Sequence, residues 1–229
     1  MNKFVTLIVL LSIVVSSCIS NTQMKEEIRY VPIGDSYTIA QGLVKEESFP
    51  YILTEHLKSN NISIRLIANP ARTGYTTKEV INYELPIFKL SEPTFSTLLI
   101  GVNDYVQGID KETFRNNFAF ILDEMLKVLP DKKLIVITIP DFSVTPEGKK
   151  FFNQKNASRE IEEFNQIIIN ESQLRKLKVV DIYQVSKEMK NKELVAKDGL
   201  HPSFKEYLIW EELIYPEAYQ MLLSNFKKI

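Results

Sequence analysis

Short apolar runs alternate with helical patterns along most of this chain, and that alternation constrains the fold more than any other feature. Runs rich in Ile, Val, Leu and Phe, each bounded by turn-forming residues, predict five buried strands at residues 28–33, 63–69, 95–100, 133–139 and 178–181. Helical spacing of apolar side chains is clearest over 111–129 and 157–174, and Ser203 is placed to cap a last helix. This order predicts a three-layer α/β/α sandwich around a five-stranded, mostly parallel sheet.

The composition fits such a domain and excludes several classes of protein. Of 229 residues, 45% are hydrophobic and 25% are charged, which is unlike a disordered, collagen-like or multi-span membrane chain. A net charge of −1 gives no electrostatic reason to expect a nucleic acid partner. A single Cys excludes an internal disulfide and a Cys-based zinc site, and only His56 and His201 can supply an imidazole.

The first residues have the pattern of an export signal rather than of a folded element. Lys3 precedes an uncharged run over residues 4–15, which is shorter than the about 20 apolar residues that a membrane-spanning helix needs. Small residues follow and lead directly to Cys18. The pattern predicts a signal peptide at 1–17, a tether at 18–27 and a single domain at 28–229.

The approach to Cys18 also resembles a bacterial lipobox, in which the Cys is lipidated and becomes the new N-terminus. Ser17, directly before the Cys, is a permitted but less usual residue of that pattern. The resemblance implies an exported protein held on a bacterial membrane through Cys18, since each buried CH₂ of an acyl chain contributes about 0.8 kcal/mol. The alternative is an ordinary signal peptide or an uncleaved anchor, with Cys18 incidental.

Three of the predicted strands end in segments with chemically useful residues, at the edge where parallel sheets bind ligands. Residues 34–37 read Gly-Asp-Ser-Tyr, so Ser36 stands at a strand-to-helix turn as either a nucleophile or a helix cap. Gly74 follows the second strand and allows a ligand close to the backbone, although a plain turn glycine has the same signature. Asn103, within Gly-Val-Asn-Asp at 101–104, either donates a hydrogen bond into the site or caps its own turn.

A fourth segment, Asp-Gly-Leu-His at residues 198–201, distinguishes the two histidines. Asp198 precedes His201 by three residues and can fold back on the imidazole, which fixes its tautomer and stabilises its charged form. Pro202 prevents a helix from running through His201. His56 lies among polar side chains and has the pattern of a surface residue.

In this order the four segments resemble the blocks of the SGNH (GDSL-type) esterase and lipase family. The family has a G-D-S start, an isolated Gly, G-x-N-D and a late D-x-x-H; this chain shows G-D-S-Y at 34–37, Gly74, G-V-N-D at 101–104 and D-G-L-H at 198–201. The resemblance spans residues 30–213, and Tyr37 stands where the family's name has Leu. Residues 134–145 and the pair at 164–165 also resemble a bacterial subgroup of lysophospholipase-like esterases.

The resemblance implies a serine esterase on an SGNH, flavodoxin-like fold. Ser36 would attack an ester carbonyl, His201 would act as general base and then as general acid, and Asp198 would orient His201. The oxyanion would accept hydrogen bonds from the backbone N–H groups of Ser36 and Gly74 and from the side-chain amide of Asn103. This chemistry requires no metal and no cofactor.

The surrounding loops define the substrate only as a small-molecule or glycan ester. Predicted pocket walls are residues 75–78, 105–109 and 142–152, in which Tyr75, Tyr105 and Phe142 would stack on a sugar, pack on an acyl chain or only anchor their loops. Asp35 and Asp104 are expected to hold their loops by hydrogen bonding rather than to transfer protons.

Several functions share these residues. We expect short acyl esters, including acetyl groups on carbohydrate, as substrates, with lysophospholipid also open. An O-acyltransferase that uses the same acyl-enzyme, or a non-catalytic surface binding protein, is the alternative function. The sequence indicates no oligomeric state.

Overall fold

The computed structural model of the protein describes residues 27–151 and 156–223, so the predicted signal peptide and Cys18 lie outside the described chain. Its strands are β1 (Ile28–Tyr30), β2 (Ile33–Gly34), β3 (Ile64–Leu66), β4 (Ser96–Leu99), β5 (Leu134–Ile137) and β6 (Lys178–Val180). All of these strands pair in parallel: β1 pairs with β3, and β2, β4, β5 and β6 follow one another in a second ladder.

The first predicted strand is divided into β1 and β2 at Pro32. Proline has no N–H to donate to a neighbouring strand, so the ladder is interrupted there. A bridge between Tyr30 and Phe95 joins the two ladders. With β1 and β2 counted as one strand, the order across the sheet is β3, β1/β2, β4, β5 and β6. This is the 2-1-3-4-5 order of flavodoxin-like folds. The predicted fold class is therefore confirmed.

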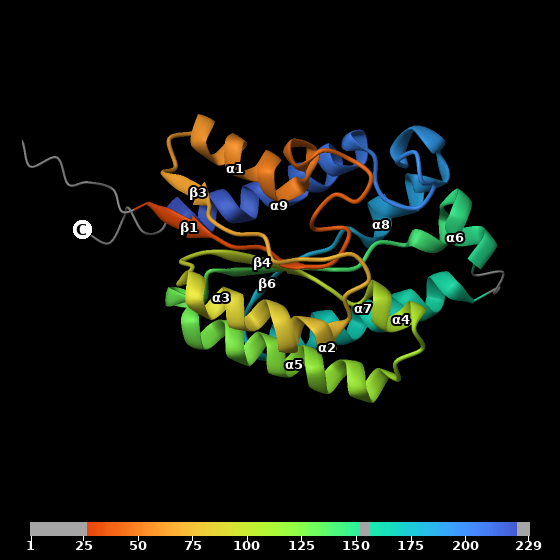
Figure 1. Ribbon diagram of the computed structural model, residues 1–229, viewed down its shortest axis with the longest axis horizontal. Coiled ribbons are helices and arrows are strands. Elements are labelled where there is room, and N and C mark those ends of the chain that lie inside the picture. Colours follow the sequence, from red (N-terminus) through yellow and green to blue (C-terminus); the bar gives the residue numbers. More distant parts are fainter. Residues whose placement is uncertain (1–26, 152–155, 224–229) are drawn as a thin grey trace, which may run out of the picture.

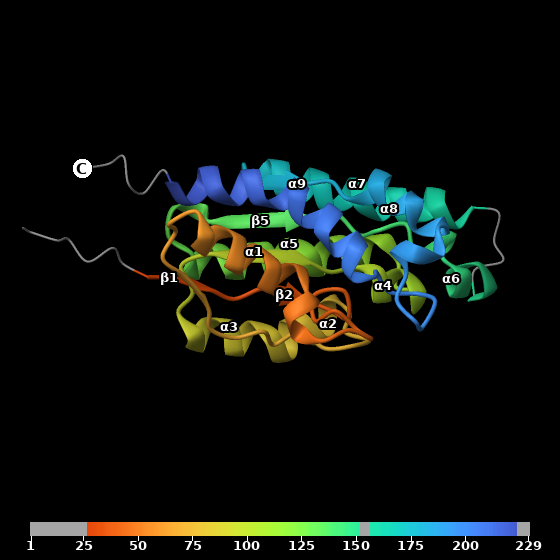
Figure 2. The same cartoon turned by 90° about the horizontal axis from the view of Figure 1, so that it is seen from above.

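Helices cover both faces of the sheet and complete the three layers (Figure 1). On one face α1 (Phe49–Ser59) packs against α9 (Phe204–Leu223), as the view from above also shows (Figure 2). On the other face α5 (Lys111–Val128) packs between α3 (Leu85–Ser91) and α7 (Ala157–Leu174). The remaining α-helices of the described chain are α2 (Thr77–Glu79), α4 (Val102–Val106), α6 (Pro146–Phe151) and α8 (Tyr183–Ser186).

The clearest helical patterns of the sequence are confirmed with nearly the predicted bounds. α5 follows Asp110, whose carboxylate caps the helix by accepting hydrogen bonds from the N–H groups of Glu112 and Thr113. Its apolar stripe is buried: Phe114, Phe118, Ile121, Leu122 and Met125. α7 has the predicted bounds, and α9 begins directly after Ser203.

The helical segment over residues 77–91 is not predicted from the sequence, because its periodicity is interrupted. A π-helical turn, Val80–Glu84, lies between α2 and α3. Such a turn holds more residues than an α-helical turn, so the apolar spacing departs from 3.6 residues. π-helical turns of this kind are frequent at functional sites.

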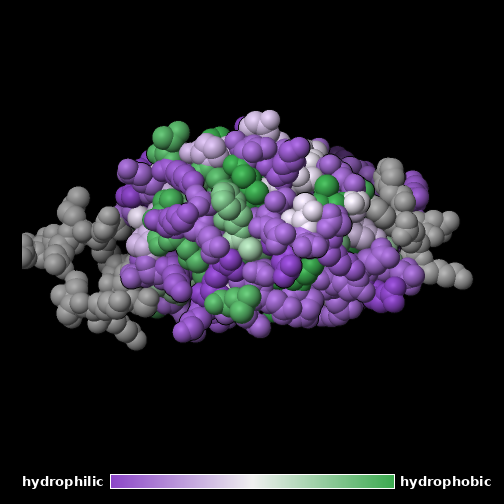
Figure 3. All heavy atoms as spheres, turned by 90° about the horizontal axis from the view of Figure 1, so that it is seen from below, coloured by the Kyte–Doolittle hydropathy of each residue, from purple (hydrophilic) through white to green (hydrophobic). Residues whose placement is uncertain are grey.

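The two ends of the sheet have different surroundings. β1 begins at one end of the molecule, and α4 and α6 lie at the other, toward which the strands' carboxyl ends point (Figure 1). The face that α3, α5 and α7 cover is mostly hydrophilic, with scattered hydrophobic side chains (Figure 3). Within the described chain, no helix combines the length and the apolar character that a membrane crossing requires.

Candidate active site

Ser36 stands in the turn that follows β2. At Gly34 the backbone runs so close to its neighbours that a Cβ would lie 2.2 Å from the Thr38 hydroxyl oxygen, so no larger residue fits. The Asp35 carboxylate tightens the turn by accepting a hydrogen bond of 3.0 Å from the Tyr37 N–H. Ser36 itself is 4% exposed, which leaves its hydroxyl in a largely dehydrated position.

Ser36, His201 and Asp198 form one chain of hydrogen bonds. The His201 Nε2 lies 2.8 Å from the Ser36 Oγ, and the His201 Nδ1 lies 2.7 Å from the Asp198 Oδ2. His201 is nearly buried, whereas 35% of the Asp198 side chain is exposed. A carboxylate at Nδ1 favours the tautomer with its proton on that nitrogen, so Nε2 is free to accept the serine proton.

The loop around Asp198 keeps that carboxyl ionised. Its Oδ1 accepts hydrogen bonds from the backbone N–H groups of Leu200 (2.9 Å) and His201 (3.0 Å). Partial burial opposes ionisation, but these bonds and the His201 ring outweigh it and hold the pKa of Asp198 below its ordinary value. The resulting anion can stabilise an imidazolium on His201.

Tyr37 packs against the His201 imidazole, although sequence analysis assigns it no role. The two ring centroids lie 5.0 Å apart with an interplanar angle of 51°. Tyr37 is buried, and the Tyr207 hydroxyl donates a hydrogen bond of 2.8 Å to its carbonyl oxygen. The aromatic residue beside Ser36 therefore limits where the His201 ring can move.

Of the three predicted oxyanion donors, Ser36 lies in the nucleophile turn, Asn103 contacts Asp35 of that turn, and Gly74 directly precedes Tyr75, which Asn103 also contacts. The Asn103 Nδ2 donates to the Tyr75 carbonyl oxygen at 2.9 Å and to an Asp35 oxygen at 3.4 Å, and the second contact is at the long limit of a hydrogen bond. Gly74 has a φ of +82°, which favours glycine, and a Cβ there would meet open space. Within the described chain, the backbone N–H groups of Ser36 and Gly74 have no hydrogen-bond acceptor, so both can donate to a ligand.

Three further carboxyls lie buried around the nucleophile turn. Asp104 accepts hydrogen bonds from the N–H and hydroxyl of Thr77, and so ties α4 to α2. Burial, assisted by the nearby Asp104 charge, raises the pKa of Asp35 to about 8. Burial, assisted by the Asp35 charge, raises the pKa of Glu84 to about 8, and burial also raises the pKa of Asp104.

These contacts confirm that Asp35 and Asp104 hold their loops. Sequence analysis does not identify Glu84, whose Oε2 accepts a hydrogen bond of 3.0 Å from the Gly34 N–H. Fifty positions separate the two residues, and the π-helical turn conceals the face on which Glu84 lies. The alternation of strands and helices carries no signal for such a contact.

The segments at 134–145 and 164–165 are joined through the Asn165 side chain. The Asn165 side chain accepts a hydrogen bond from the Ile139 N–H and donates one to the Ile139 carbonyl oxygen, both at 2.8 Å. Asp141 is buried and accepts hydrogen bonds from the hydroxyls of Ser143 and Ser158. These residues fix the loop after β5 and do not contact the Ser36 side chain.

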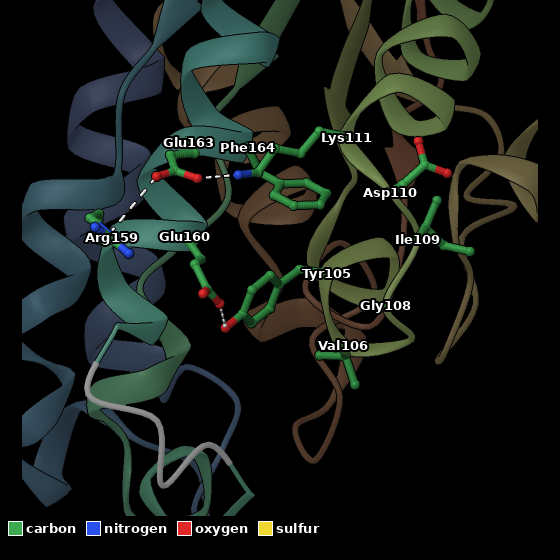
Figure 4. Close-up of a pocket in the computed structure, with 10 residues that line it drawn as sticks. All are labelled: Tyr105, Val106, Gly108, Ile109, Asp110, Lys111, Arg159, Glu160, Glu163 and Phe164. Carbon is green, nitrogen blue, oxygen red and sulfur yellow. Dashed lines mark hydrogen bonds and ion pairs between the residues drawn. The ribbon is translucent and has the colours of Figure 1, made fainter.

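Tyr105, one of the predicted pocket walls, lines a depression between α4 and α7. Its hydroxyl donates a hydrogen bond of 2.9 Å to Glu160 on α7 (Figure 4). Its ring packs against Phe142 and Phe164. The depression has a volume of about 660 Å³ and is lined by Tyr105, Val106, Gly108, Ile109, Asp110, Lys111, Arg159, Glu160, Glu163 and Phe164. Neither Ser36 nor His201 lines this depression.

His56 occupies the surface position that the sequence predicts, with two contacts that it does not reveal. The His56 Nδ1 lies 2.9 Å from a carboxylate oxygen of Glu211 on α9. The imidazole stacks on the Tyr215 ring with centroids 3.6 Å apart, and 42% of the side chain is exposed. The residue joins α1 to α9 away from Ser36. Within the described chain, no group of three or more His, Cys, Asp or Glu side chains is arranged to hold a metal ion.

The overall fold is also found in solved structures of esterases. The chain is similar to a Clostridium thermocellum family 3 carbohydrate esterase (19% identity, TM-score 0.69, covering 87% of this chain and 98% of that one). It is similar to Axe2, an acetylxylan esterase from Geobacillus stearothermophilus (15% identity, TM-score 0.68, covering 83% and 94%). It is similar to TesA as well (18% identity, TM-score 0.67, covering 84% and 99%). At these identities the likeness shows a shared fold.

The sequence itself carries the family assignment. No curated protein matches the chain significantly. A sequence model of the GDSL-like Lipase/Acylhydrolase family matches residues 33–207, a range that contains each of the four segments around the site. The chain therefore belongs to the GDSL-like lipase/acylhydrolase family and is an ester-bond hydrolase.

Proposed function

We propose that this hydrolase is a serine esterase that cleaves short acyl esters through an acyl-enzyme on Ser36. The observation that carries the proposal is the unbroken chain of hydrogen bonds from Asp198 through His201 to the Ser36 hydroxyl, at 2.7 and 2.8 Å. An isolated serine is a weak nucleophile, and a base in contact with its hydroxyl activates it.

In the first half of the reaction, the Ser36 Oγ attacks the ester carbonyl carbon while its proton passes to the His201 Nε2. Asp198 stabilises the imidazolium that forms and holds its tautomer. The C–O bond to the alcohol then breaks, and the leaving alkoxide takes the proton from Nε2. The products of this half are the free alcohol and an acyl-enzyme on Ser36.

In the second half, water replaces the alcohol. The His201 Nε2 accepts a proton from the water as its oxygen attacks the acyl-enzyme carbonyl. The bond to the Ser36 Oγ breaks, and the same proton returns to that oxygen, which regenerates the serine and releases the carboxylic acid. No other group of the chain has to change protonation state.

The negative charge on the tetrahedral intermediates is stabilised by three donors. These are the backbone N–H groups of Ser36 and Gly74, which have no acceptor within the described chain, and the Asn103 amide. The long 3.4 Å contact of the amide with Asp35 can give way to an oxyanion, while the 2.9 Å bond to Tyr75 keeps Asn103 in place. One donor of this kind contributes about 10²- to 10³-fold to turnover.

Acetyl and other short acyl esters on carbohydrate are the substrates we favour. The solved structures that resemble this chain include an acetylxylan esterase and a family 3 carbohydrate esterase, which supports this class over others. The strands run from the end of the molecule where β1 begins toward the end where α4 and α6 lie (Figure 1), and Ser36 follows the carboxyl end of β2. A tether attached before β1 would therefore direct the site away from a membrane, toward a soluble or polymeric substrate.

A fluorophosphonate probe followed by a panel of esters tests the function. We expect stoichiometric labelling of Ser36, located by peptide mass spectrometry, and none in the Ser36→Ala variant, because only an activated serine reacts. Hydrolysis should be fastest for acetylated sugars and acetyl aryl esters and should decline with acyl length. Efficient turnover without labelling at Ser36 would contradict the mechanism. A preference for lysophospholipid would contradict the substrate class, and acceptor-dependent ester formation would identify a transferase.

We further propose that the protein is exported and held on a bacterial membrane by lipid on Cys18. The support is the sequence pattern before that residue and the uncharged run over residues 4–15. Metabolic labelling with an alkyne fatty acid tests it. Wild-type protein should be labelled and sediment with membranes, whereas Cys18→Ser should be unlabelled. Equal labelling of the two proteins would refute lipidation at this position.

A further inference from the structure

One helical segment connects the turn that carries Ser36 to α4, which carries Asn103. At its first residue, Thr77, the N–H and the hydroxyl donate hydrogen bonds to the two carboxylate oxygens of Asp104, at 2.9 and 2.5 Å. At its last residue, Glu84, the carboxylate accepts a hydrogen bond of 3.0 Å from the Gly34 N–H. Asp104 directly follows Asn103, and Gly34 lies two residues before Ser36. We call residues 77–84 the bridging segment.

The sheet itself explains why a side chain is needed at Gly34. β3 ends opposite Tyr30, so among the described residues no strand extends beside Gly34 on the side away from β4. A backbone N–H that is buried without an acceptor destabilises the folded state. The Glu84 carboxyl supplies that acceptor in place of a strand carbonyl.

The π-helical turn brings Glu84 to this position. The Leu85 N–H donates to the Val80 carbonyl oxygen, five residues earlier, instead of four as in an α-helix. The wider turn adds one residue between Thr77 and Glu84. In a regular α-helix the side chain would point about 100° away from its present direction, because successive residues are that far apart around the axis.

Packing alone does not account for a glutamate at this place. Glu84 is 0% exposed, its Oε1 has no hydrogen-bond partner within the described chain, and no Lys or Arg there forms an ion pair with it. An apolar residue of the same length would fill the space without the cost of burying a carboxyl. Its one hydrogen bond goes to the strand end that leads into the nucleophile turn.

We propose that Glu84 is a positioning residue, which holds the Gly34 N–H and thereby fixes the Ser36 hydroxyl relative to the Asn103 oxyanion donor across the bridging segment. This rests on the proposed function, because it assigns Glu84 a part in the chemistry of Ser36. The positioning role requires only a carbonyl-type oxygen on the side chain at position 84 and no negative charge. Burial and the nearby Asp35 raise the pKa of Glu84, which agrees with an uncharged acid, and Arg72 is the cation that opposes this shift.

Two substitutions separate the acceptor from the volume of the side chain. Glu84→Gln keeps an acceptor oxygen at the same length, and Glu84→Met fills similar space without one. With an acetyl aryl ester we expect Glu84→Gln to keep kcat within about threefold of wild type. Glu84→Met should lower kcat by about 10- to 100-fold with KM changed less than about twofold, because a small misplacement of a reacting group slows chemistry more than binding.

Glu206 provides a matched control. It is also 0% exposed, accepts one N–H, from the Trp210 ring, and has a second oxygen without a partner within the described chain. Glu206→Met should lower thermal stability to a similar degree but leave kcat within about twofold when the rates are compared at equal folded fraction. If Glu84→Met does not fold, Glu84→Asp replaces it, since its carboxyl is withdrawn by one methylene group.

The outcomes distinguish this proposal from the proposed function. Equal kcat values for the Glu84→Met and Glu206→Met variants would overturn it, and so would an equal loss in Glu84→Gln and Glu84→Met. Full hydrolysis by Ser36→Ala would instead refute the mechanism on which it rests. A loss confined to Glu84→Met, with fluorophosphonate labelling of Ser36 slowed in the same proportion, is the expected result.

Discussion

Each of the two histidines of this chain places its Nδ1 beside a carboxylate oxygen, but the surroundings of the two imidazoles differ. His201 places its Nδ1 2.7 Å from a carboxylate oxygen of Asp198, and His56 places its Nδ1 2.9 Å from one of Glu211. What differs is the remaining nitrogen and its surroundings. The His201 Nε2 lies 2.8 Å from the Ser36 hydroxyl in a nearly buried position, whereas the His56 ring stacks on Tyr215 and is 42% exposed.

The comparison teaches that a carboxylate beside an imidazole does not by itself indicate catalysis. Such a pair also joins one helix to another, as His56 joins α1 to α9. A polar group on the second nitrogen, at the carboxyl end of the sheet, is what gives the His201 pair a proton to move. Substitutions in the two pairs should therefore have different effects.

The largest difference is expected when each imidazole is removed. His201→Ala should lower kcat for an acetyl aryl ester by roughly 10⁴- to 10⁶-fold, because Ser36 loses its general base. His56→Ala should keep kcat within about twofold. Steady-state kinetics on both variants, with circular dichroism to verify the fold, provides the measurement. Comparable losses in the two variants would show that the contact with Ser36 does not decide function.

The carboxylates give the second comparison. Asp198→Asn should lower kcat by about 10³- to 10⁴-fold, because an amide at Nδ1 favours the wrong tautomer and does not stabilise the imidazolium. Glu211→Gln should leave kcat nearly unchanged, since the His56 ring transfers no proton. The readout is kcat against pH for each variant. If Asp198→Asn retains most of its activity, another group must orient His201.

Asn103 gives the third comparison, because the amide next to His56, that of Asn60, donates its hydrogen bond to the His56 carbonyl oxygen, at 3.1 Å, rather than to a ligand. Asn103→Ala should lower kcat by about 10²- to 10³-fold with little change in KM, because the oxyanion forms only along the reaction path. Asn103→Asp serves as the partner variant, which keeps the size and removes the donor. An increase confined to KM would make Asn103 a substrate-binding residue instead.

Contacts between sequence neighbours, or between the ends of adjacent strands, could be predicted from the sequence. Asp198 and His201 are three residues apart, and parallel strand ends must meet at one edge, which brings Ser36 and Asn103 together. The five strands and the helices α5 and α7 followed from periodicity for the same reason. Each of these signals is local or is set by topology.

Contacts that join distant segments through side-chain direction could not be predicted. Glu84 reaches Gly34 from 50 positions away, and Glu211 reaches His56 from 155. The π-helical turn alters which residues share a face, and Pro32 divides a run that reads as one strand. The direction of the Tyr105 ring toward α7, where Glu160 accepts a hydrogen bond from the Tyr105 hydroxyl, has no signal in the sequence either. Such directions depend on the packing of whole layers rather than on the local sequence.

The smallest expected effect is on the pH dependence of the free energy of unfolding. Its sign differs between Asp198 and Glu211, the carboxylates of the two histidine pairs. The pKa of Asp198 is held below its ordinary value, so the folded state gains stability from this carboxylate above about pH 3.9 and loses it as the pH falls further. The pKa of Glu211 is raised by burial, and the hydrogen bond from His56 offsets this only in part. Stability from Glu211 is therefore greatest below about pH 4.3 and declines as the pH rises toward its folded pKa.

Urea unfolding at pH 3.5 and pH 6 tests these opposite signs. Relative to wild type, Asp198→Asn should destabilise the fold more at pH 6, and Glu211→Gln more at pH 3.5. We expect the difference between the two pH values to be below about 1 kcal/mol for Asp198, because solvent screens a side chain that is 35% exposed. If the destabilisation of both variants changes in the same direction between the two pH values, the two carboxylates share one electrostatic environment. In that case the contrast between the pairs would rest on the Ser36 contact alone.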